Sequence, residues 1–364
     1  MSLILGIESS CDETAAAVVK DGSDVLGACV ASQIARHAEH GGVVPELAAR
    51  EHLKAARPVL EGALSQAGVT LKDIDAIAVT QGPGLIPALL VGLNLAKGLA
   101  VGNDLPLIGI NHFIAHIYAS FLDGGKEELE KVETYPILAL VVSGGHTALL
   151  LIDEAGQAKL VGTTIDDAAG EALDKASKML GLGYPGGPII QKTAESGDAS
   201  KYHFPRPLTG AAGKAVAPEH KYNFSFSGVK TALLYHVQKL TGKNGTLEGQ
   251  ELYDTVASYQ EAVVDVLCRK TALAAKDFNA RTVVLCGGVA CNSVLRERMG
   301  TSLPQGAKLR LAERKYCTDN AAMVGGLAHY YFEKGQFTQL DADSYARLPS
   351  IADVPFVKFK DVEA

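Results

Sequence analysis

A strand, a short polar turn and a returning strand occur twice in this 364-residue sequence, and the repeat constrains the fold more than any other feature. Residues 3–19 read as an apolar run, a polar turn and a second apolar run, and residues 137–152 repeat that order. Two hairpins of one kind, about 130 residues apart, indicate two duplicated halves. Helical patterns follow each hairpin, so the sequence predicts an α/β fold and not an antiparallel sandwich.

Apolar periodicity locates the main elements between and after the two hairpins. Apolar residues recur at helical spacing over residues 46–67, 168–180 and 251–277, which predicts three helices. Short apolar runs at 74–79 and 282–286 predict two strands.

The longest apolar run, from Leu85 to Val101, contains Asn94 and Lys97 and has helical periodicity. We therefore expect a core helix and no membrane contact.

The N-terminus lacks a basic segment and soon meets Glu8, unlike a signal peptide. Six scattered cysteines without a CxxC pair favour a reducing compartment, and we expect a cytoplasmic protein.

The charge balance limits how the chain can handle nucleic acid. With 34 basic and 41 acidic residues, the net charge is −7. Affinity for RNA depends on phosphate neutralisation, so any RNA contact must use a local basic patch or a partner protein. Arg36, Arg50, Lys54 and Arg57 are close in sequence, although a solvated helix face is the commoner explanation.

His112 and His116 follow an apolar strand and open a helical run. Their spacing places both imidazoles on one helix face, within reach of a single metal ion. Such pairs also occur by chance, so a third ligand is needed. Asp319 precedes another helical run, and two histidines with one carboxylate are typical of Fe(II) or Zn(II) sites with open positions. The alternative is that Thr318 or Asp319 caps that helix.

Glycine pairs follow two buried strands, in Ser143-Gly-Gly and in Gly287-Gly288. Glycine lets a ligand approach the backbone, so these turns can present N–H groups to phosphate oxygens. An ordinary turn explains either pair alone, but the recurrence favours a nucleotide. Asn292 follows the second pair and adds an amide able to bind an adenine or a hydroxyl.

An acidic segment opens the helix predicted over 168–180. Asp166 or Asp167 is expected to cap it, and Glu171 and Lys175 to form an i,i+4 ion pair. Asp174 is then available for ribose hydroxyls, with a solvated helix face as the alternative.

Three segments have no assigned chemistry. Residues 37–52 concentrate three histidines and three acids around a glycine pair, and their spacing assigns them no role. Residues 123–134 and 210–221 are expected to be surface loops.

Taken in order, a series of short motifs resembles the TsaD family, also called Gcp or YgjD. The motifs are Gly6–Thr14, Gly41–Ala48, Gly82–Leu85, the His112/His116 pair, Val142–Thr147, Asp166–Glu171, Tyr184–Pro188, Phe224–Gly228, Gly287–Ala290 and Cys317–Asn320. The similarity runs from residue 3 to about residue 335, and the ordered set is specific although each motif alone is weak.

The resemblance implies the ASKHA fold of actin, Hsp70 and sugar kinases, with two duplicated lobes and a nucleotide in the cleft between them. Under that resemblance, residues 1–111 and 112–318 form the N-terminal and C-terminal lobes. A helix over 319–335 returns to the first lobe, and 336–364 form an irregular tail.

The family's reaction moves a threonylcarbamoyl group from threonylcarbamoyl-AMP to N6 of adenosine 37 in tRNAs that read codons beginning with A. The products are t6A and AMP. The family's positions imply one divalent metal ion per subunit, Fe(II) or Zn(II), on His112, His116 and Asp319. They imply substrate contacts at Val141, Val142, Ser143, Gly144, Gly145, Asp174, Gly187 and Asn292.

In the first hairpin, Asp12 and Glu13 are candidates for proton transfer.

The resemblance also implies TsaB-like and TsaE-like protein partners, with a TsaC-type enzyme supplying the adenylate. This chain departs from the family pattern at Cys291, where alanine is common, and in the two loops at 123–134 and 210–221.

Two other functions compete with this one. A metalloprotease activity, O-sialoglycoprotein endopeptidase, was once attached to the family, but zincin proteases place glutamate beside the first histidine, where this chain has Phe113. A non-catalytic nucleotide-binding scaffold is the second alternative. It has no need for all three metal-ligand residues, which this sequence retains.

Overall fold

The computed structural model describes residues 1–210, 213, 215–242 and 245–347. Part of the expected loop 210–221 and residues 348–364 of the expected tail therefore lie outside the described residues. The chain forms two compact units. Unit 1 contains Met1–Thr134, Asp153–Ala158 and Ala312–Ala364, and unit 2 contains Tyr135–Ile152 and Lys159–Leu311.

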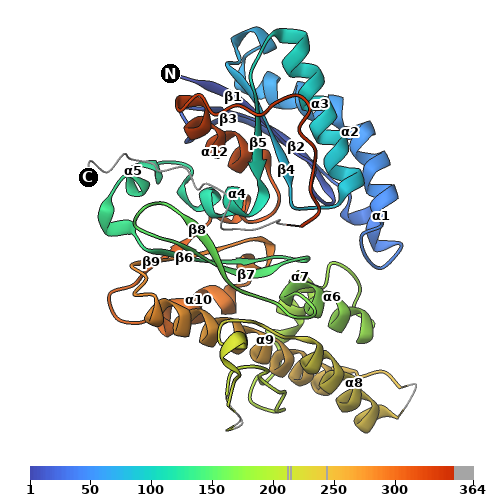
Figure 1. The fold of residues 1–364 in the computed structure, drawn as a ribbon. Coiled ribbons are helices and arrows are strands. Elements are labelled where there is room, and N and C mark those ends of the chain that lie inside the picture. Colours follow the sequence, from blue (N-terminus) through green and yellow to red (C-terminus); the bar gives the residue numbers. More distant parts are fainter. Residues whose placement is uncertain (211–212, 214, 243–244, 348–364) are drawn as a thin grey trace. The chain divides into compact units, whose positions relative to one another are not determined.

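Unit 1 is built on a five-stranded sheet with the order β3-β2-β1-β4-β5 (Figure 1). Its first three strands form an antiparallel meander, whereas β4 and β5 run parallel to β1. The strands are β1 (Leu3–Glu8), β2 (Glu13–Lys20), β3 (Asp24–Ser32), β4 (Ala76–Gly82) and β5 (Leu107–Asn111).

Helices pack on both faces of this sheet because its central strands are apolar on both faces. Leu5 and Ile7 of β1 belong to the core cluster that includes Val59 of α2 and Leu93 of α3. On the other face, Gly6 lets α12 approach β1 closely, since a Cβ there would collide with the backbone of α12. The unit 1 helices are α1 (Ile34–Ala38), α2 (Pro45–Ala67), α3 (Ile86–Asn103), α4 (His112–Tyr118), α5 (Lys126–Leu129), α11 (Arg314–Cys317) and α12 (Ala321–Glu333).

Unit 2 repeats the plan with a five-stranded sheet of order β10-β9-β6-β7-β8. Its strands are β6 (Ile137–Val142), β7 (Thr147–Ile152), β8 (Ala158–Thr163), β9 (Thr282–Cys286) and β10 (Lys308–Leu311). Its helices are α6 (Ala169–Met179), α7 (Gly186–Ala194), α8 (Ser227–Thr241), α9 (Gly249–Asp277) and α10 (Ser293–Ser302). As in unit 1, a central strand pairs antiparallel with the next strand and parallel with a later one.

The two sheets confirm the α/β fold and the duplication that the hairpins predict. Strands β1, β2, β3, β4 and β5 take the same places in their sheet as β6, β7, β8, β9 and β10 take in theirs. The predicted elements also agree closely with those observed, and the strands over residues 137–142 and 282–286 match residue for residue.

Several segments differ from the expectations. Residues 123–134 are not a simple surface loop, because they contain α5 and bury Leu129. The compact units also divide the chain elsewhere than the expected lobes, since the segment from His112 to Thr134 belongs to unit 1. Within the described part of the tail, the Thr338 hydroxyl oxygen accepts a hydrogen bond from the backbone N–H of Gly109, at 2.7 Å.

Among the described residues, one helix is long and apolar enough to cross a membrane by length and composition, namely α3. It packs against β4 and α2 within unit 1, and buries Ala88, Leu89, Leu93 and Ala96. A helix whose apolar side covers a sheet is the ordinary core helix that the sequence predicts.

Candidate metal centre and glycine-loop site

The histidine pair is positioned by the junction between β5 and α4. Asn111 ends the strand and caps the helix, because its side-chain oxygen accepts from the N–H groups of Phe113 and Ile114 at 3.0 and 3.2 Å. Helix α4 therefore starts at His112, with His116 one turn later. The two imidazole centroids are 4.5 Å apart and both rings are buried.

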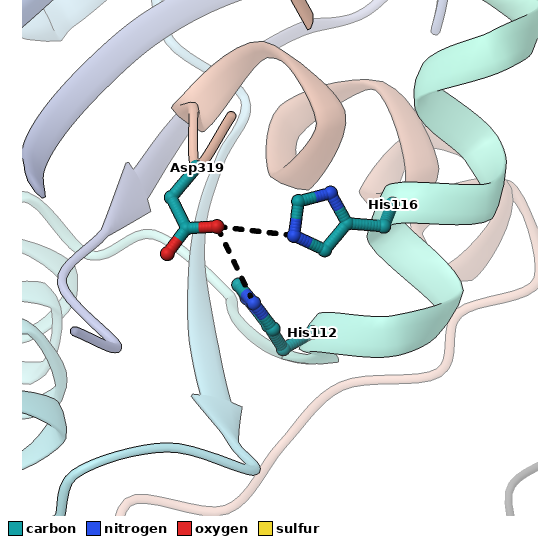
Figure 2. Close-up of side chains that lie close together, drawn as sticks. All are labelled: His112, His116 and Asp319. Carbon is teal, nitrogen blue, oxygen red and sulfur yellow. Dashed lines mark hydrogen bonds and ion pairs between the residues drawn. The ribbon is translucent and has the colours of Figure 1, made fainter. Parts of the chain in front are cut away.

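Asp319 reaches the same place from the start of α12 (Figure 2). Its Oδ1 lies 3.0 Å from His116 Nε2 and 3.6 Å from His112 Nε2. Neither Thr318 nor Asp319 caps α12, so the alternative that one of them is a helix cap is wrong. Asn320 is the cap, and its side chain accepts from Met323 N–H at 3.0 Å. The Asp319 carboxylate is turned to the histidines instead.

Glu8 is a further member of this centre, and sequence reasoning missed it. Its carboxylate is fully buried at the end of β1, where it accepts from the Thr80 hydroxyl and the Ser10 N–H, each at 2.5 Å. Glu8 Oε2 also lies 3.2 Å from His112 Nδ1. A carboxylate on one ring nitrogen fixes the imidazole and leaves the other nitrogen facing a metal, the usual support of a ligating histidine.

The charges of this centre are strongly coupled. Burial opposes ionisation of both Glu8 and His112, but their mutual attraction prevails and lowers the pKa of Glu8. For His112, the carboxylates of Asp319 and Glu8 outweigh burial and raise its pKa to about 9. Burial, together with the nearby carboxylates of Asp319 and Asp12, raises the pKa of Glu13 to about 10. The centre thus has more carboxylates than cations to balance them.

Several features of His112, His116 and Asp319 fit a divalent metal ion. Their ligand atoms all lie within 4.8 Å of one another. Two ligands held about 2.0–2.2 Å from one ion are roughly 3.0–3.5 Å apart, and the nitrogen-to-oxygen separations here are 3.0 and 3.6 Å. Nitrogen and oxygen donors with one carboxylate suit iron or zinc.

The structure brings Asp12 and Glu13 close to this centre, in and after the β1–β2 turn. Glu13 interacts electrostatically with Asp319 and forms a side-chain hydrogen bond with Asp12. The backbone carbonyl of Asp12 accepts from Gln33 N–H at 2.9 Å. The two acids are therefore neighbours of the three ligand residues within unit 1.

In the glycine turn after β6, packing does not exclude a side chain at either glycine. Ser143 N–H donates to the His146 carbonyl at 2.8 Å and closes the turn. A Cβ at Gly144 or Gly145 would meet no atom within 4 Å. By contrast, a Cβ at Gly287 would collide with the Val142 carbonyl, and Gly287 has a φ of +92°.

This contrast separates two kinds of glycine. Gly287 is required by the fold, because its backbone conformation and close packing exclude a side chain. Gly144 and Gly145 are not required by the fold, and neither are Gly187 and Gly288, which also have open space. Bare backbone beside open space suits a ligand that approaches the amides.

The other expected substrate residues are all in unit 2, although several are already engaged. Val141 and Val142 are buried within β6, so only their backbone is available to a ligand. Asp174 Oδ1 accepts from Gly186 N–H at 2.6 Å and so holds the turn that carries Gly187.

Asn292 caps α10 and also donates to the Gln260 side chain at 2.8 Å. Its amide is thus committed within unit 2 in the described structure. The residue holds the end of the Gly287–Cys291 turn.

Asp166 and Asp167 do not cap α6, contrary to expectation. Asp166 accepts from the hydroxyls of Ser225 and Ser227, each at 2.6 Å, and so anchors the start of α8. Asp167 forms ion pairs with Lys175 and Lys230, each at 2.8 Å. The expected ion pair of Glu171 with Lys175 is confirmed at 2.7 Å.

Comparison with known families gives a match across most of the chain. Residues 24–326 match the TsaD family, described as tRNA N6-adenosine threonylcarbamoyltransferase. A protein of that name from Syntrophotalea carbinolica is 48% identical over 95% of this chain and 96% of its own length. Another, from Symbiobacterium thermophilum, is 50% identical over 94% of this chain and 95% of its own.

Solved structures at low identity share the fold. The activator of 2-hydroxyisocaproyl-CoA dehydratase from Clostridium difficile, with bound ADPNP, has a TM-score of 0.52 at 16% identity and covers 93% of this chain and 100% of that one. HypF of T. kodakarensis has a TM-score of 0.58 at 14% identity, covering 93% of this chain and 48% of that one. Together with the two duplicated sheets, they show an ASKHA-type fold.

Proposed function

The chain belongs to the TsaD family of tRNA N6-adenosine threonylcarbamoyltransferases, and from that premise we propose how its two units divide the work of the reaction. The enzyme moves the threonylcarbamoyl group from threonylcarbamoyl-AMP to N6 of adenosine 37, in tRNAs that read codons beginning with A. It forms t6A and releases AMP. The cluster of His112, His116 and Asp319 supports the metal-dependent part of this proposal.

His112, His116 and Asp319 are the proposed ligands of one divalent ion, Fe(II) or Zn(II). When bound, such an ion supplies Lewis acidity and a template for the acyl group. Glu8 supports His112 from its Nδ1 side and keeps Nε2 directed to the ion. The surplus of carboxylates in unit 1 also favours a cation over an empty centre.

Unit 2 is proposed to bind the AMP part of the donor. Amides of Gly144 and Gly145 can donate to phosphate oxygens, because a ligand can approach the backbone where a Cβ at either glycine would meet no atom within 4 Å. Gly187 lies in the first turn of α7, where backbone N–H groups favour anions. Asp174 holds that turn through Gly186, and its carboxylate remains the proposed partner of ribose hydroxyls.

Adenine N6 is a poor nucleophile, since its lone pair is delocalised into the ring. Its attack on the carbamoyl carbon breaks the bond from that carbon to the phosphate oxygen, and N6 loses a proton. Burial and the carboxylates of Asp319 and Asp12 raise the pKa of Glu13 to about 10, and a cation held by Asp319 would oppose that rise. Asp12 and Glu13 are both proposed as acceptors of this proton.

Partners and location follow from the same family membership. We propose that tRNA is the acceptor, that TsaB-like and TsaE-like proteins assist the reaction, and that a TsaC-type enzyme supplies the adenylate. We place the reaction in the cytoplasm, where tRNA is modified. The acidic net charge of −7 supports a need for partners that add basic surface.

Reconstitution tests the activity directly. The chain, its partners, tRNA and threonylcarbamoyl-AMP are incubated together, and t6A is measured by nucleoside mass spectrometry. We expect t6A to form only when the chain is present, and to disappear when a chelator removes the metal. Formation of t6A without the chain would refute the proposal. Cleavage of a glycoprotein substrate in place of t6A would favour the protease alternative.

A further inference from the structure

The sequence pattern gives the histidine-rich segment 37–52 no role, but in the structure two of its histidines belong to a hydrogen-bond network that supports the β1–β2 turn. His37 and His52 are both fully buried in unit 1. Neither is a proposed metal ligand, and neither has a role in the mechanism above. Both have well-defined partners, and those partners connect them to the turn that carries Asp12.

His52 joins α2 directly to the turn. Its Nε2 lies 3.0 Å from the Cys11 carbonyl oxygen, and its Nδ1 lies 2.8 Å from the Thr14 hydroxyl. A carbonyl oxygen can only accept, so Nε2 carries the proton and donates it to Cys11. In the neutral ring, Nδ1 must then accept from the Thr14 hydroxyl. Burial lowers the pKa of His52 and so favours this neutral form.

Gln33 fixes the next carbonyl along the turn, that of Asp12, and His37 in turn holds the Gln33 side chain. Gln33 N–H donates to the Asp12 carbonyl at 2.9 Å, while its side-chain amide donates to the Ala48 carbonyl at 3.3 Å. His37 Nδ1 accepts from Val44 N–H at 3.3 Å, which leaves Nε2–H to donate to the Gln33 side-chain oxygen at 3.1 Å. One chain of bonds thus runs from the glycine-containing loop before α2 to Asp12.

Two consecutive carbonyls of the turn are therefore fixed, that of Cys11 by His52 and that of Asp12 by Gln33, which precedes the segment and is held by His37. The direction of the Asp12 and Glu13 side chains depends on this backbone. We propose that His52 and Gln33 are positioning residues for the transfer reaction, and that they hold Asp12 and Glu13 in the orientation the reaction needs. This inference rests on the proposed function in one respect, namely the part assigned to Asp12 and Glu13.

Two substitutions at one position test the proposal. His52→Leu removes both hydrogen bonds, whereas His52→Gln keeps an N–H donor near the place of Nε2. A misplacement of about 1 Å in a reacting group costs on the order of 100-fold in rate. We expect His52→Leu to lower kcat by about 10- to 100-fold with KM for threonylcarbamoyl-AMP nearly unchanged. His52→Gln should recover most of that loss.

A second readout does not depend on activity. Cys11 is half-buried in the turn, and burial together with the Asp12 carboxylate raises the pKa of its thiol, so its alkylation should be slow. His52→Leu should speed alkylation of Cys11, measured by peptide mass spectrometry. The half-buried Cys29 of β3 is the internal control and should keep its rate.

His329→Leu is the matched control, because it also removes a buried histidine from unit 1. His329 bonds to the Ser2 hydroxyl and Lys126 and has no bond to the turn. It should lose stability without changing kcat or Cys11 alkylation. The proposal is overturned if His52→Leu keeps the wild-type kcat, or if His52→Gln is as impaired as His52→Leu. Failure of the wild-type chain to make t6A would instead refute the proposed function, and unchanged Cys11 alkylation would still refute the support itself.

Discussion

The β1–β2 turn of unit 1 and the β6–β7 turn of unit 2 occupy equivalent places in sheets of the same strand order, yet their chemistry differs. The first is preceded by the buried carboxylate of Glu8 and leads through Asp12 to Glu13. The second, 143–146, offers a hydroxyl, two glycines and an imidazole, and a Cβ at either glycine would meet no atom within 4 Å. A shared backbone plan therefore does not dictate a shared ligand.

The two sheets have the same strand order, so the chemical difference between the two turns comes from their side chains and not from the backbone topology. Carboxylates favour a cation at the first turn, whereas glycine backbone that a ligand can approach favours an anion at the second. The charge of the whole units follows the same division. Acidic residues outnumber basic ones in unit 1, and basic residues outnumber acidic ones in unit 2.

The largest effect is expected from removing a metal ligand in unit 1. Alanine in place of His112, His116 or Asp319 should abolish stoichiometric metal and lower t6A formation by at least about 100-fold, because each change deletes one of three ligands. The fold should persist. Elemental analysis of the purified variants decides the matter, with Glu154→Ala, an exposed acid of unit 1, as control. Stoichiometric metal in all three variants would rule out this ligand set.

In unit 2, two glycine substitutions should separate binding from folding. Gly287→Ala should destabilise the chain by about 1–3 kcal/mol, since φ is +92° and the new Cβ meets the Val142 carbonyl. Gly144→Ala should leave the melting temperature nearly unchanged but weaken AMP binding at least about tenfold, or about 1.4 kcal/mol. Calorimetry and thermal melts measure the two effects. Wild-type AMP affinity in Gly144→Ala would remove the anion site from this turn.

Asp174→Asn should produce a smaller change, confined to the nucleotide. An amide oxygen still accepts from Gly186 N–H, now 2.6 Å from Asp174 Oδ1, but it is a weaker acceptor for ribose hydroxyls than a carboxylate. We expect AMP affinity to fall by about threefold to tenfold and metal content to stay constant. An unchanged dissociation constant for AMP would leave Asp174 with only the role of holding the turn.

The smallest effect concerns tRNA. The isolated chain should bind tRNA weakly, and tight binding should require the assembled complex, because a chain of net charge −7 neutralises few phosphates. In unit 1, Lys54 and Arg57 of the suggested basic face are already paired with Glu51 and Glu61. Affinities of chain and complex across a salt series measure the difference. Equal affinity and equal salt slope would contradict the prediction.

A matched pair of variants sharpens that test. Reversing the charge of Lys178 and Lys192, both exposed in unit 2, should weaken the residual tRNA binding more than the same change at Lys54 and Arg57. Each lost phosphate contact should reduce the salt slope by about 1. An equal effect of the two pairs would show that the charge division between the units does not guide tRNA.

The strands that the apolar pattern located are largely buried, and all of them except β5 are central in their sheets. Strand β6 is buried throughout, and so its apolar run is unmistakable in the sequence. The sequence analysis did not identify β3, β8 and β10, which lie at the edges of their sheets. Strand β3 alternates exposed positions with mostly half-buried ones, and β10 alternates lysine and arginine with leucine. An edge strand needs less apolar surface, so its pattern resembles that of a loop.

Spacing alone identified the two histidines as potential ligands, because four residues make one helical turn wherever a helix forms. The third ligand depended on packing. His116 and Asp319 are 203 residues apart in sequence. They meet because Gly6 lets α12 approach β1. The sequence could suggest Asp319 by residue type but could not distinguish a ligand from a helix cap until Asn320 was seen to be the cap.

The sequence by itself determined the duplicated hairpins, the buried strands, the long helices and the residue types of the two centres. These properties depend on residues close together in the chain, so periodicity and spacing express them directly. Only the tertiary structure placed Glu8 behind His112, joined His52 to Cys11 and distinguished Gly144 from Gly287. Those contacts arise when distant elements pack, and their energies depend on burial and geometry that no local pattern encodes.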